Sequence, residues 1–444
     1  MAFLRADAPN SIGRVLFIGV ERQGKPMRRR HYVSVVGAAA CGVSAGCLGS
    51  GADTALPDGV VAETVTEDLS NPWGLAFLPD DPRLVVTERD TGRVVLVDRE
   101  NGTKTAVDGV PTVDSAGQGG LLDAAIHPNF STEPWLYLTY SAGTGDGRTT
   151  THLGRGRLDP NAGTLSEFEV LYRAEPVLDR VNHYGSRVVF GGDGRLYMSV
   201  GDRQFKNFSP DHVAQDLTND LGTTLRFEPD GSIPADNPFV DSEERSSSSS
   251  RAKPGDSDER SSSGSRAKPG DNPDARDAIY SYGHRNPQGL AVHPETGALW
   301  ESEHGERDGD ELNVIEAGGN YGWPVATYAC EYGTDRPVGD SPAEREDLIP
   351  PVYYWECGSG GFPPAGMTFY TGPINDWQGN LFVGNLAGTY LGRFSVDGTD
   401  VTEREPLLDG RGWRMRAVAT APETGHLYVA VDAGSAPVVR LAPE

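Results

Sequence analysis

The feature that most constrains the fold is a strand–turn–strand motif that occurs six times along the chain. Each copy has a short apolar strand, a turn with Pro, Asp, Glu or Gly, and a second apolar strand, as in "RVVFGGDGRLYMSVGD" from Arg187. The other copies begin at Gly74, Asp123, Gly289, Gly366 and Ala417. Short strands, glycine-containing turns and little helical periodicity indicate antiparallel sheet. We therefore expect an all-β six-bladed β-propeller with antiparallel four-stranded blades. A pair of β-sandwiches is the alternative, although it would not require such even recurrence.

The longest interval between copies contains a tandem duplication. "ERSSSSSRAKPGD" (244–256) returns as "ERSSSGSRAKPGD" (259–271). Serine, charge and proline cannot bury apolar area, so we expect a disordered surface insertion at about 241–275. The propeller itself is predicted to span 58–444.

Residues 1–57 resemble an export signal followed by a linker. A basic cluster at Arg28–Arg30 precedes a short apolar stretch and then "VSAGC", which ends at Cys47. Paired arginines before an apolar run resemble a twin-arginine signal, and "VSAGC" resembles a lipobox. We expect an exported protein that is lipid-anchored through Cys47 to the outer face of the cell membrane, and Met27 is a candidate start. A basic N-terminus without an export role is the alternative.

The formal net charge of −25 is spread along the chain. Such a surface excludes nucleic acid as a partner, since phosphate binding requires positive charge, and it fits a high-salt habitat. Beyond the leader only Cys330 and Cys357 remain, without a CxxC pattern. In an exported protein they could form one disulfide, and two free buried thiols are the alternative.

Polar residues precede the first strand of several motif copies. In a propeller these positions share one end of the central channel, so we expect them to form one rim. Cations, amides and an imidazole gathered there suit an anionic ligand with several carbonyls. The rim residues are Gln118, His183, Arg285, Asn286, Gln288, Arg414 and Arg416.

The segment "EHGERDGDELNVIEAGGNYGWP" (303–324) gathers acidic residues among glycines. Oxygen ligands on a flexible backbone suit Ca²⁺ better than Zn²⁺. The spacing is not that of an EF-hand, and a solvated acidic loop is the alternative.

Taken together, the motifs resemble the soluble sugar dehydrogenases that use pyrroloquinoline quinone (PQQ): the glucose/sorbosone dehydrogenase family, in its aldose dehydrogenase branch. The resemblance runs from about Asn71 to Asp432. It rests on "NPWGLAF", "GQGGLLDAAIHPNF", "HYGSRVVFGGDGRLYMSVGDR", "YGHRNPQGLA", the acidic segment and "WRMRAV".

The resemblance implies an enzyme that oxidises the C1 hydroxyl of aldoses to lactones and passes electrons to an unknown acceptor. It places the general base on His183, which takes the hydroxyl proton while hydride moves to PQQ. It places cofactor binding on Gln118, Arg285, Asn286, Arg414 and Arg416, with Arg285 also stabilising the reduced quinone oxygen.

The resemblance also implies two calcium ions. The backbone carbonyls of Gly305 and Glu306 would hold a catalytic ion against PQQ, and Glu311 and Tyr321 would hold a structural one.

Three positions depart from the family pattern. Glu306 stands where a proline is usual, Ala387 where the glucose branch has a PQQ-contacting lysine, and His304 where that branch has a glutamine. Two other functions remain open: a non-catalytic propeller that binds carbohydrate or protein without PQQ, and a calcium-dependent hydrolase of the lactonase type.

Overall fold

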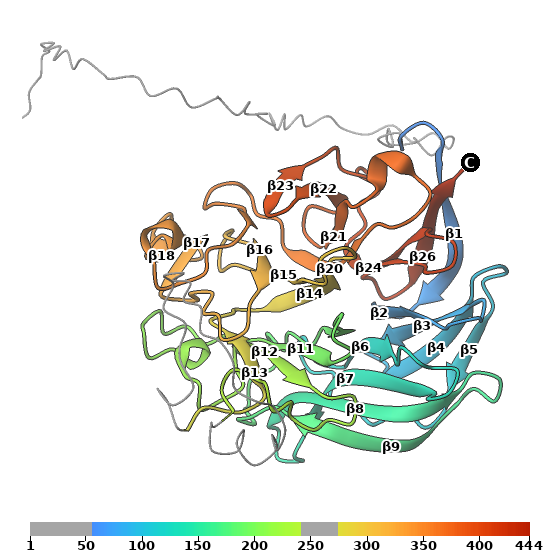
Figure 1. The fold of residues 1–444 in the computed structure, drawn as a ribbon. Helices are drawn as coiled ribbons and strands as arrows, with labels where there is room; N and C mark the ends of the chain where they lie inside the picture. The colour runs from blue at the N-terminus through green and yellow to red at the C-terminus, as the bar shows by residue number, and fades with distance from the viewer. Residues whose placement is uncertain (1–55, 241–273) are drawn as a thin grey trace, which may run out of the picture. The chain divides into compact units, whose positions relative to one another are not determined.

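The computed structural model describes residues 56–240 and 274–444. In these residues, six antiparallel four-stranded sheets surround a common axis, which confirms the predicted propeller and excludes paired sandwiches (Figure 1). The described residues contain no α-helix, only the short 3-10 helices η1 (Val213–Gln215), η2 (Pro342–Glu344) and η3 (Asn375–Trp377). The predicted anchor Cys47, the leader up to residue 55 and residues 241–273 of the insertion lie outside the described residues.

The six sheets follow the chain in order, and we number them as blades. Blade 1 has β2 (Pro72–Phe77), β3 (Arg83–Glu88), β4 (Arg93–Asp98) and β5 (Lys104–Val107). Blade 2 has β6 (Leu121–Ile126), β7 (Trp135–Gly143), β8 (Thr149–Asp159) and β9 (Thr164–Arg173). Blade 3 has β10 (Val188–Phe190), β11 (Leu196–Val200), β12 (Thr223–Phe227) and β13 (Ile279–Tyr282).

The remaining blades complete the ring. Blade 4 has β14 (Pro287–Val292), β15 (Leu299–Glu303), β16 (Glu311–Ile315) and β19 (Tyr353–Tyr354). Blade 5 has β20 (Pro364–Phe369), β21 (Leu381–Asn385), β22 (Leu391–Asp397) and β23 (Asp400–Glu403). Blade 6 has β24 (Met415–Thr420), β25 (Leu427–Val431) and β26 (Ala436–Pro443), with β1 (Val60–Leu69) as its outer strand.

Each sequence motif forms the two inner strands of one blade. In blade 3, β10 pairs with β11 so that Val188 lies opposite Met198 and Phe190 opposite Leu196. The turn between them uses Gly194 at φ 78°, a conformation that glycine adopts without strain. The inner strands β2, β6, β10, β14, β20 and β24 contact one another in sequence around the axis.

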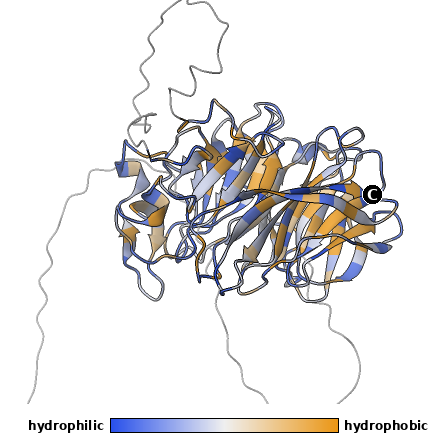
Figure 2. Cartoon of the chain, turned by 90° about the horizontal axis from the view of Figure 1, so that it is seen from below, coloured by the Kyte–Doolittle hydropathy of each residue, from blue (hydrophilic) through white to orange (hydrophobic). Residues whose placement is uncertain are grey.

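The hydrophobic core lies between neighbouring blades. Six clusters of buried side chains each join two adjacent sheets; for example, Tyr137 of β7 packs in one cluster with Leu196 and Leu225 of blade 3. Figure 2 shows this division, with apolar residues concentrated in the strands and polar residues in the connecting loops. The packing explains why every copy of the motif is rich in apolar residues.

The first strand of the chain closes the last blade. β1 runs antiparallel to β26, with Val60 opposite Pro443 and Leu69 opposite Ala436. Leu56, which we had assigned to the linker, packs against the core of blades 5 and 6. Leu56 therefore packs with the propeller, although it lies ahead of the predicted boundary at 58.

A buried arginine ties the inner strands together across the axis. The Arg187 guanidinium binds the Asp123 carboxylate at 3.1 Å and donates to the backbone oxygens of Trp73, Gln288 and Arg416. Five blades are thereby joined at one side chain. Because both charged groups are buried, removing either one would leave the other unpaired at a high cost.

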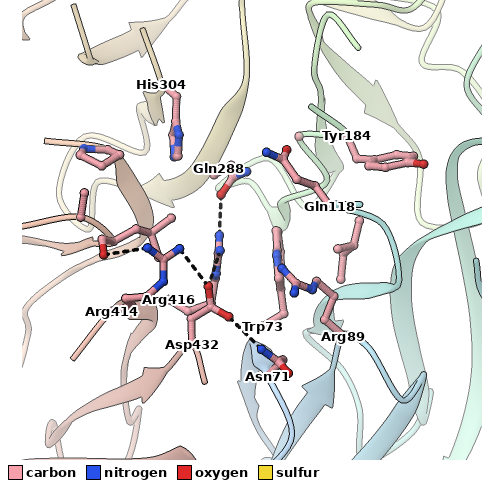
Figure 3. A pocket seen from close by; sticks show the side chains of 15 residues that line it. Asn71, Trp73, Arg89, Gln118, Tyr184, Gln288, His304, Arg414, Arg416 and Asp432 are labelled. Atoms are coloured by element: carbon pink, nitrogen blue, oxygen red, sulfur yellow. Dashed lines mark hydrogen bonds and ion pairs between the residues drawn. The ribbon is translucent and has the colours of Figure 1, made fainter. Parts of the chain in front are cut away.

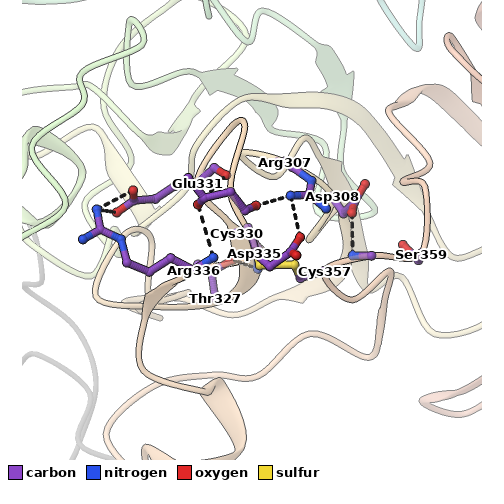
Figure 4. Close-up of a disulfide and its surroundings, with 12 residues drawn as sticks. Arg307, Asp308, Thr327, Cys330, Glu331, Asp335, Arg336, Cys357 and Ser359 are labelled. Atoms are coloured by element: carbon purple, nitrogen blue, oxygen red, sulfur yellow. Dashed lines mark hydrogen bonds and ion pairs between the residues drawn. A yellow bond between two sulfur atoms is a disulfide. The ribbon is translucent and has the colours of Figure 1, made fainter. Parts of the chain in front are cut away.

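A small hairpin lies outside the six blades. It consists of β17 (Ala326–Cys330) and β18 (Pro337–Gly339), and a disulfide joins Cys330 to Cys357 with Cα atoms 5.5 Å apart (Figure 4). This decides between the two alternatives for the cysteines in favour of the disulfide. Arg307 exchanges two backbone hydrogen bonds with Cys330, so the hairpin is attached to the acidic segment.

No helix in residues 56–240 or 274–444 has the length and apolar character needed to cross a bilayer.

Candidate active site

A cavity of about 440 Å³ lies where the six inner strands begin (Figure 3). Its size falls within the range of about 300–1,000 Å³ that is usual for cofactor and ligand pockets. The polar side chains that line it are Asn71, Arg89, Gln118, Gln288, His304, Arg414, Arg416 and Asp432, with the rings of Trp73 and Tyr184 beside them.

Arg416 is the most buried cation of this cavity. Its Nη2 donates to the Asp432 carboxylate at 2.8 Å, its Nη1 donates to the Gln288 side-chain oxygen, and its Nε has no hydrogen-bond partner. Burial lowers the pKa of Arg416 to about 10, so the side chain stays charged at neutral pH. Burial alone would raise the pKa of Asp432, but the ion pair with Arg416 lowers it to about 2.

The lining as a whole is positive. Arg414 is half exposed and shares Asp432 with Arg416, and Arg89 contributes a third guanidinium. Three cations face one carboxylate, since His304 is neutral: burial, then the nearby charges of Arg416 and Arg285, lower the pKa of His304 to about 3. A cavity with this charge and several amides suits an anionic ligand that carries carboxylate and carbonyl oxygens.

His183 lies in the loop before β10, and its imidazole is oriented by a carboxylate. Its Nδ1 is 2.7 Å from Asp202, which can only accept, so Nδ1 carries the proton and Nε2 keeps a lone pair. Asp202 is fully buried and also accepts from Trp323 Nε1 at 2.8 Å. The backbone at His183 has φ 50°, and a Cβ at Gly201 would lie 2.4 Å from the His183 carbonyl oxygen, so the loop requires glycine there.

Burial, together with the charge of Arg285, lowers the pKa of His183 below its usual value, although Asp202 opposes this shift. The imidazole is therefore neutral at neutral pH and free to accept a proton at Nε2.

Arg285 and Asn286 are buried just ahead of β14 and are not among the residues that line the cavity. Arg285 Nη1 donates to the His304 carbonyl and Nη2 to the Glu306 carboxylate, while its Nε has no hydrogen-bond partner. The Asn286 side-chain oxygen is likewise buried without a partner. Buried polar atoms are nearly always hydrogen-bonded in native proteins, so these atoms have capacity for a further partner, either a water molecule or a ligand.

The acidic segment forms a tight loop between β15 and β16. The Asp310 carboxylate accepts from the Gly305 and Phe362 backbone nitrogens, and the Gly309 nitrogen donates to the Trp355 oxygen. A Cβ at Gly305 would lie 1.9 Å from the Asp308 oxygen. The loop that carries the carbonyl groups of Gly305 and Glu306 is therefore fixed by its own contacts.

Glu311 lies in a separate buried cluster rather than at the cavity. Burial and the neighbouring Glu303 raise its pKa well above the usual value. His284 Nδ1 lies 2.8 Å from Glu301 and 3.3 Å from Glu303, and these three side chains have the spacing of metal ligands. Burial opposes the shift, but the neighbouring Glu301 and Glu303 raise the pKa of His284 to about 10, so its imidazole is protonated at neutral pH and itself pairs with these carboxylates.

Tyr321 contributes its ring to this cluster, stacked on His284 with centroids 4.7 Å apart. Its hydroxyl accepts from the Glu316 nitrogen and donates to the Val314 oxygen. The hydroxyl oxygen of Tyr321 therefore already takes part in two hydrogen bonds.

The structure thus brings most of the predicted residues to one region. Gln118, Arg414 and Arg416 line the cavity, and Gln118 accepts from the His183 nitrogen at 2.8 Å. Arg285 joins this region because its carbonyl accepts from the Asp202 nitrogen. Ala387 also lines the cavity, as expected for the position where the glucose branch has a lysine.

Sequence analysis missed several residues of the site. The prediction did not include Arg89, Asp202 or Asp432. Each of them lies one or two residues after the end of the second strand of its blade. Because a hairpin returns the chain to the end where it began, these positions share an end with the residues ahead of the first strand. That signal was present in "VTER", "SVGD" and "VAVD".

The chain is similar to known proteins over most of its length. The sequence model of the family described as "Glucose / Sorbosone dehydrogenase" matches residues 69–249 and 262–440. Aldose sugar dehydrogenase YliI of Escherichia coli strain K12 is 36% identical over 401 residues, covering 89% of this chain and 96% of the relative.

Two more distant relatives name a quinone cofactor. Quinoprotein glucose dehydrogenase B of Acinetobacter calcoaceticus is 32% identical, over 83% of this chain and 85% of its own. The PQQ-bound form of aldose sugar dehydrogenase from Streptomyces coelicolor superimposes with a TM-score of 0.65 at 27% identity, covering 88% of this chain and all of that one.

Proposed function

The chain belongs to the glucose/sorbosone dehydrogenase family, and from that premise we propose that it oxidises the C1 hydroxyl of aldose sugars to lactones with PQQ and Ca²⁺. One observation carries the proposal. Arg285, Asn286 and Arg416 were predicted to bind the cofactor, and each keeps a buried polar atom without a hydrogen-bond partner beside a positively lined cavity.

The cavity residues would bind and orient the cofactor. Its carboxylates suit Arg414, Arg416 and Arg89, because guanidinium groups pair with carboxylates in a planar, two-pronged geometry. Gln118 offers a side-chain amide whose oxygen is already used by the His183 nitrogen, which leaves its NH₂ for the ligand. The rings of Trp73 and Tyr184 help to exclude water from this end.

His183 would act as the general base. Its Nε2 accepts the proton of the C1 hydroxyl, and Asp202 holds the tautomer that leaves this nitrogen bare and stabilises the imidazolium that forms. When bound, PQQ supplies the two-electron acceptor for the hydride. Arg285 holds a fixed positive charge near this base and would stabilise negative charge on a quinone oxygen of the bound cofactor.

Calcium binding is part of the proposal. The rigid loop around Gly305 and Glu306 offers backbone carbonyl oxygens, which are suitable calcium ligands. The second cation would bind beside Glu311 and Glu303, where a divalent ion would offset the repulsion between the two buried carboxylates. Glu301, Glu303 and His284 also have the spacing of metal ligands, but an ion there would have to displace the proton of His284. Tyr321 would support that site by its stacking on His284.

We also propose that the protein is exported and lipid-anchored through Cys47, and that an aldose and an external electron acceptor are its partners. The Cys330–Cys357 disulfide supports an extracytoplasmic location, because disulfides persist in oxidising compartments.

The test is reconstitution of the purified protein with PQQ and Ca²⁺, followed by dye reduction with a panel of aldoses. We expect sugar-dependent reduction and a cofactor absorbance that survives desalting. If neither is observed, the protein is a binding propeller and the enzyme proposal fails. Hydrolysis of lactones without PQQ would instead favour the lactonase alternative.

A further inference from the structure

We propose that the Glu306 carboxylate competes with the cofactor for Arg285, so that cofactor uptake requires the ion pair between these two residues to open. The inference rests on the proposed function and deepens it. It concerns the side chain of Glu306, which stands where the family usually has proline, rather than its backbone carbonyl.

The contacts of Arg285 show the competition. The side chains of Arg285 and Glu306 are only 3% and 4% exposed, and Arg285 Nη2 donates to Glu306 at 2.7 Å. Arg285 Nη1 donates to the His304 carbonyl, and its Nε has no partner. Glu306 thus engages one edge of the guanidinium that would donate to a quinone oxygen.

Glu306 has a second cation on its outer side. Lys206 Nζ forms an ion pair with the same carboxylate, and the Lys206 side chain is 45% exposed. The lysine lies 5.2 Å from the ring of Tyr332, which is itself 63% exposed at the surface. The carboxylate is therefore shared between a buried guanidinium and an exposed ammonium group.

This arrangement lets the ion pair between Arg285 and Glu306 open without leaving either charge unpaired. A buried guanidinium without a counterion is costly, so Glu306 leaves Arg285 readily only when another anion arrives. Lys206 then keeps the released carboxylate paired. The main chain at Glu306 is held by the Arg307–Cys330 backbone bonds and the contacts of Asp310, so the exchange needs only a side-chain rotation.

The experiment measures PQQ uptake by calcium-saturated protein in stopped flow, from the absorbance of the bound cofactor and without sugar. Glu306→Gln keeps the shape of the side chain and removes its charge. We expect uptake about tenfold faster than wild type, because a charge-assisted hydrogen bond is replaced by a weaker neutral one. Lys206→Met removes the outer partner, and we expect uptake about threefold slower.

The ion pair between Glu331 and Arg336 on the β17–β18 hairpin provides matched controls. Glu331→Gln and Arg336→Met make the same charge changes without touching Arg285, so they report only the general attraction of an anionic ligand. The thermal midpoint of each variant verifies folding.

The inference is overturned if Glu306→Gln takes up PQQ no faster than Glu331→Gln, or if Lys206→Met is no slower than Arg336→Met. If wild type itself takes up no PQQ, the proposed function fails, and this inference fails with it. The two failures are therefore distinguishable.

Discussion

The two ends of the central channel are built from the same six inner strands but differ in the side chains that line them. Where the inner strands begin, the cavity is lined by arginines and amides, among them Gln288 and Arg416. Where they end, a second cavity of about 400 Å³ is lined mainly by aliphatic and threonine side chains, such as Val292 and Thr420. The Arg187–Asp123 pair borders this second cavity and binds the backbone of residues that line the first.

The difference shows that one inner strand contributes residues to both cavities. In β24, Arg416 faces the first cavity and Ala417 to Thr420 face the second. In β14, Gln288 faces the first and Leu290 to Val292 face the second. In these two strands the start carries a polar side chain that lines the first cavity, and the remaining residues line the second cavity or pack the ring. This contrast predicts that equal substitutions at the two ends have unequal consequences.

The largest expected effect is at the base. His183→Ala should lower turnover per bound PQQ about a thousandfold, the usual scale of general base catalysis, and keep the cofactor bound. Steady-state kinetics normalised to bound PQQ provides the measurement. Thr420→Ala at the opposite end should leave turnover unchanged. A variant that loses cofactor but retains wild-type turnover per bound PQQ would contradict the assignment.

The next effect is at the buried cation. Arg416→Met removes a guanidinium from the cofactor cavity and leaves Asp432 without its main partner, so we expect PQQ affinity to fall about a hundredfold. Equilibrium dialysis measures it. Thr368→Val, which changes a residue lining the second cavity, is the control. Equal loss of affinity in both variants would mean that the two ends do not differ as described.

Removal of calcium tests a third region, the buried carboxylates around Glu311, which lies outside both cavities of the channel. Chelation should lower the thermal midpoint by about 5 °C, because the cation no longer screens the buried carboxylates around Glu311. Differential scanning calorimetry with and without Ca²⁺ tests this. In Glu311→Gln the calcium-dependent part of the shift should disappear, and an undiminished shift would place the stabilising ion elsewhere.

The smallest expected effect is in the pH profile. The base works only when neutral, so activity falls as pH drops through the pKa of His183. Burial and Arg285 lower that pKa, so the acid limb of kcat/KM should lie below about 6.5, the unperturbed histidine value. The charge of Lys206 contributes to the lowering, so Lys206→Met should move the limb slightly upward. If the acid limb moved to lower pH in this variant, the assignment of Lys206 as a cause of the lowered pKa of His183 would be wrong.

The fold was predictable because it depends on repetition. Few architectures accommodate six copies of one strand–turn–strand motif. An error in the strand boundaries of any single copy therefore does not change the predicted fold. The grouping of the candidate residues was predictable where a residue lies in the segment ahead of an inner strand, as His183 and Arg285 do. Asp202, Asp432 and Arg89 were missed because only their polarity was considered, and not the return of the hairpin to the same end.

Other features depend on side-chain placement and could not be derived from sequence. The sharing of Glu306 between Arg285 and Lys206 joins residues 100 positions apart, from two blades. The cluster around Glu311 draws Glu301 and Glu303 from the neighbouring strand β15 and His284 from the segment before β14. Spacing alone does not distinguish these acidic residues from the many others in so acidic a chain.

The pairing of β1 with β26 has a consequence for biosynthesis. The first strand of the ring emerges from the ribosome long before residues 436–443 exist to receive it. Until β26 has been synthesised, the nascent chain exposes an unpaired strand that can pair with other chains. A premature stop before residue 436 would leave that strand permanently without a partner. Closure of the ring therefore depends on the synthesis of β26, the partner that its first strand requires.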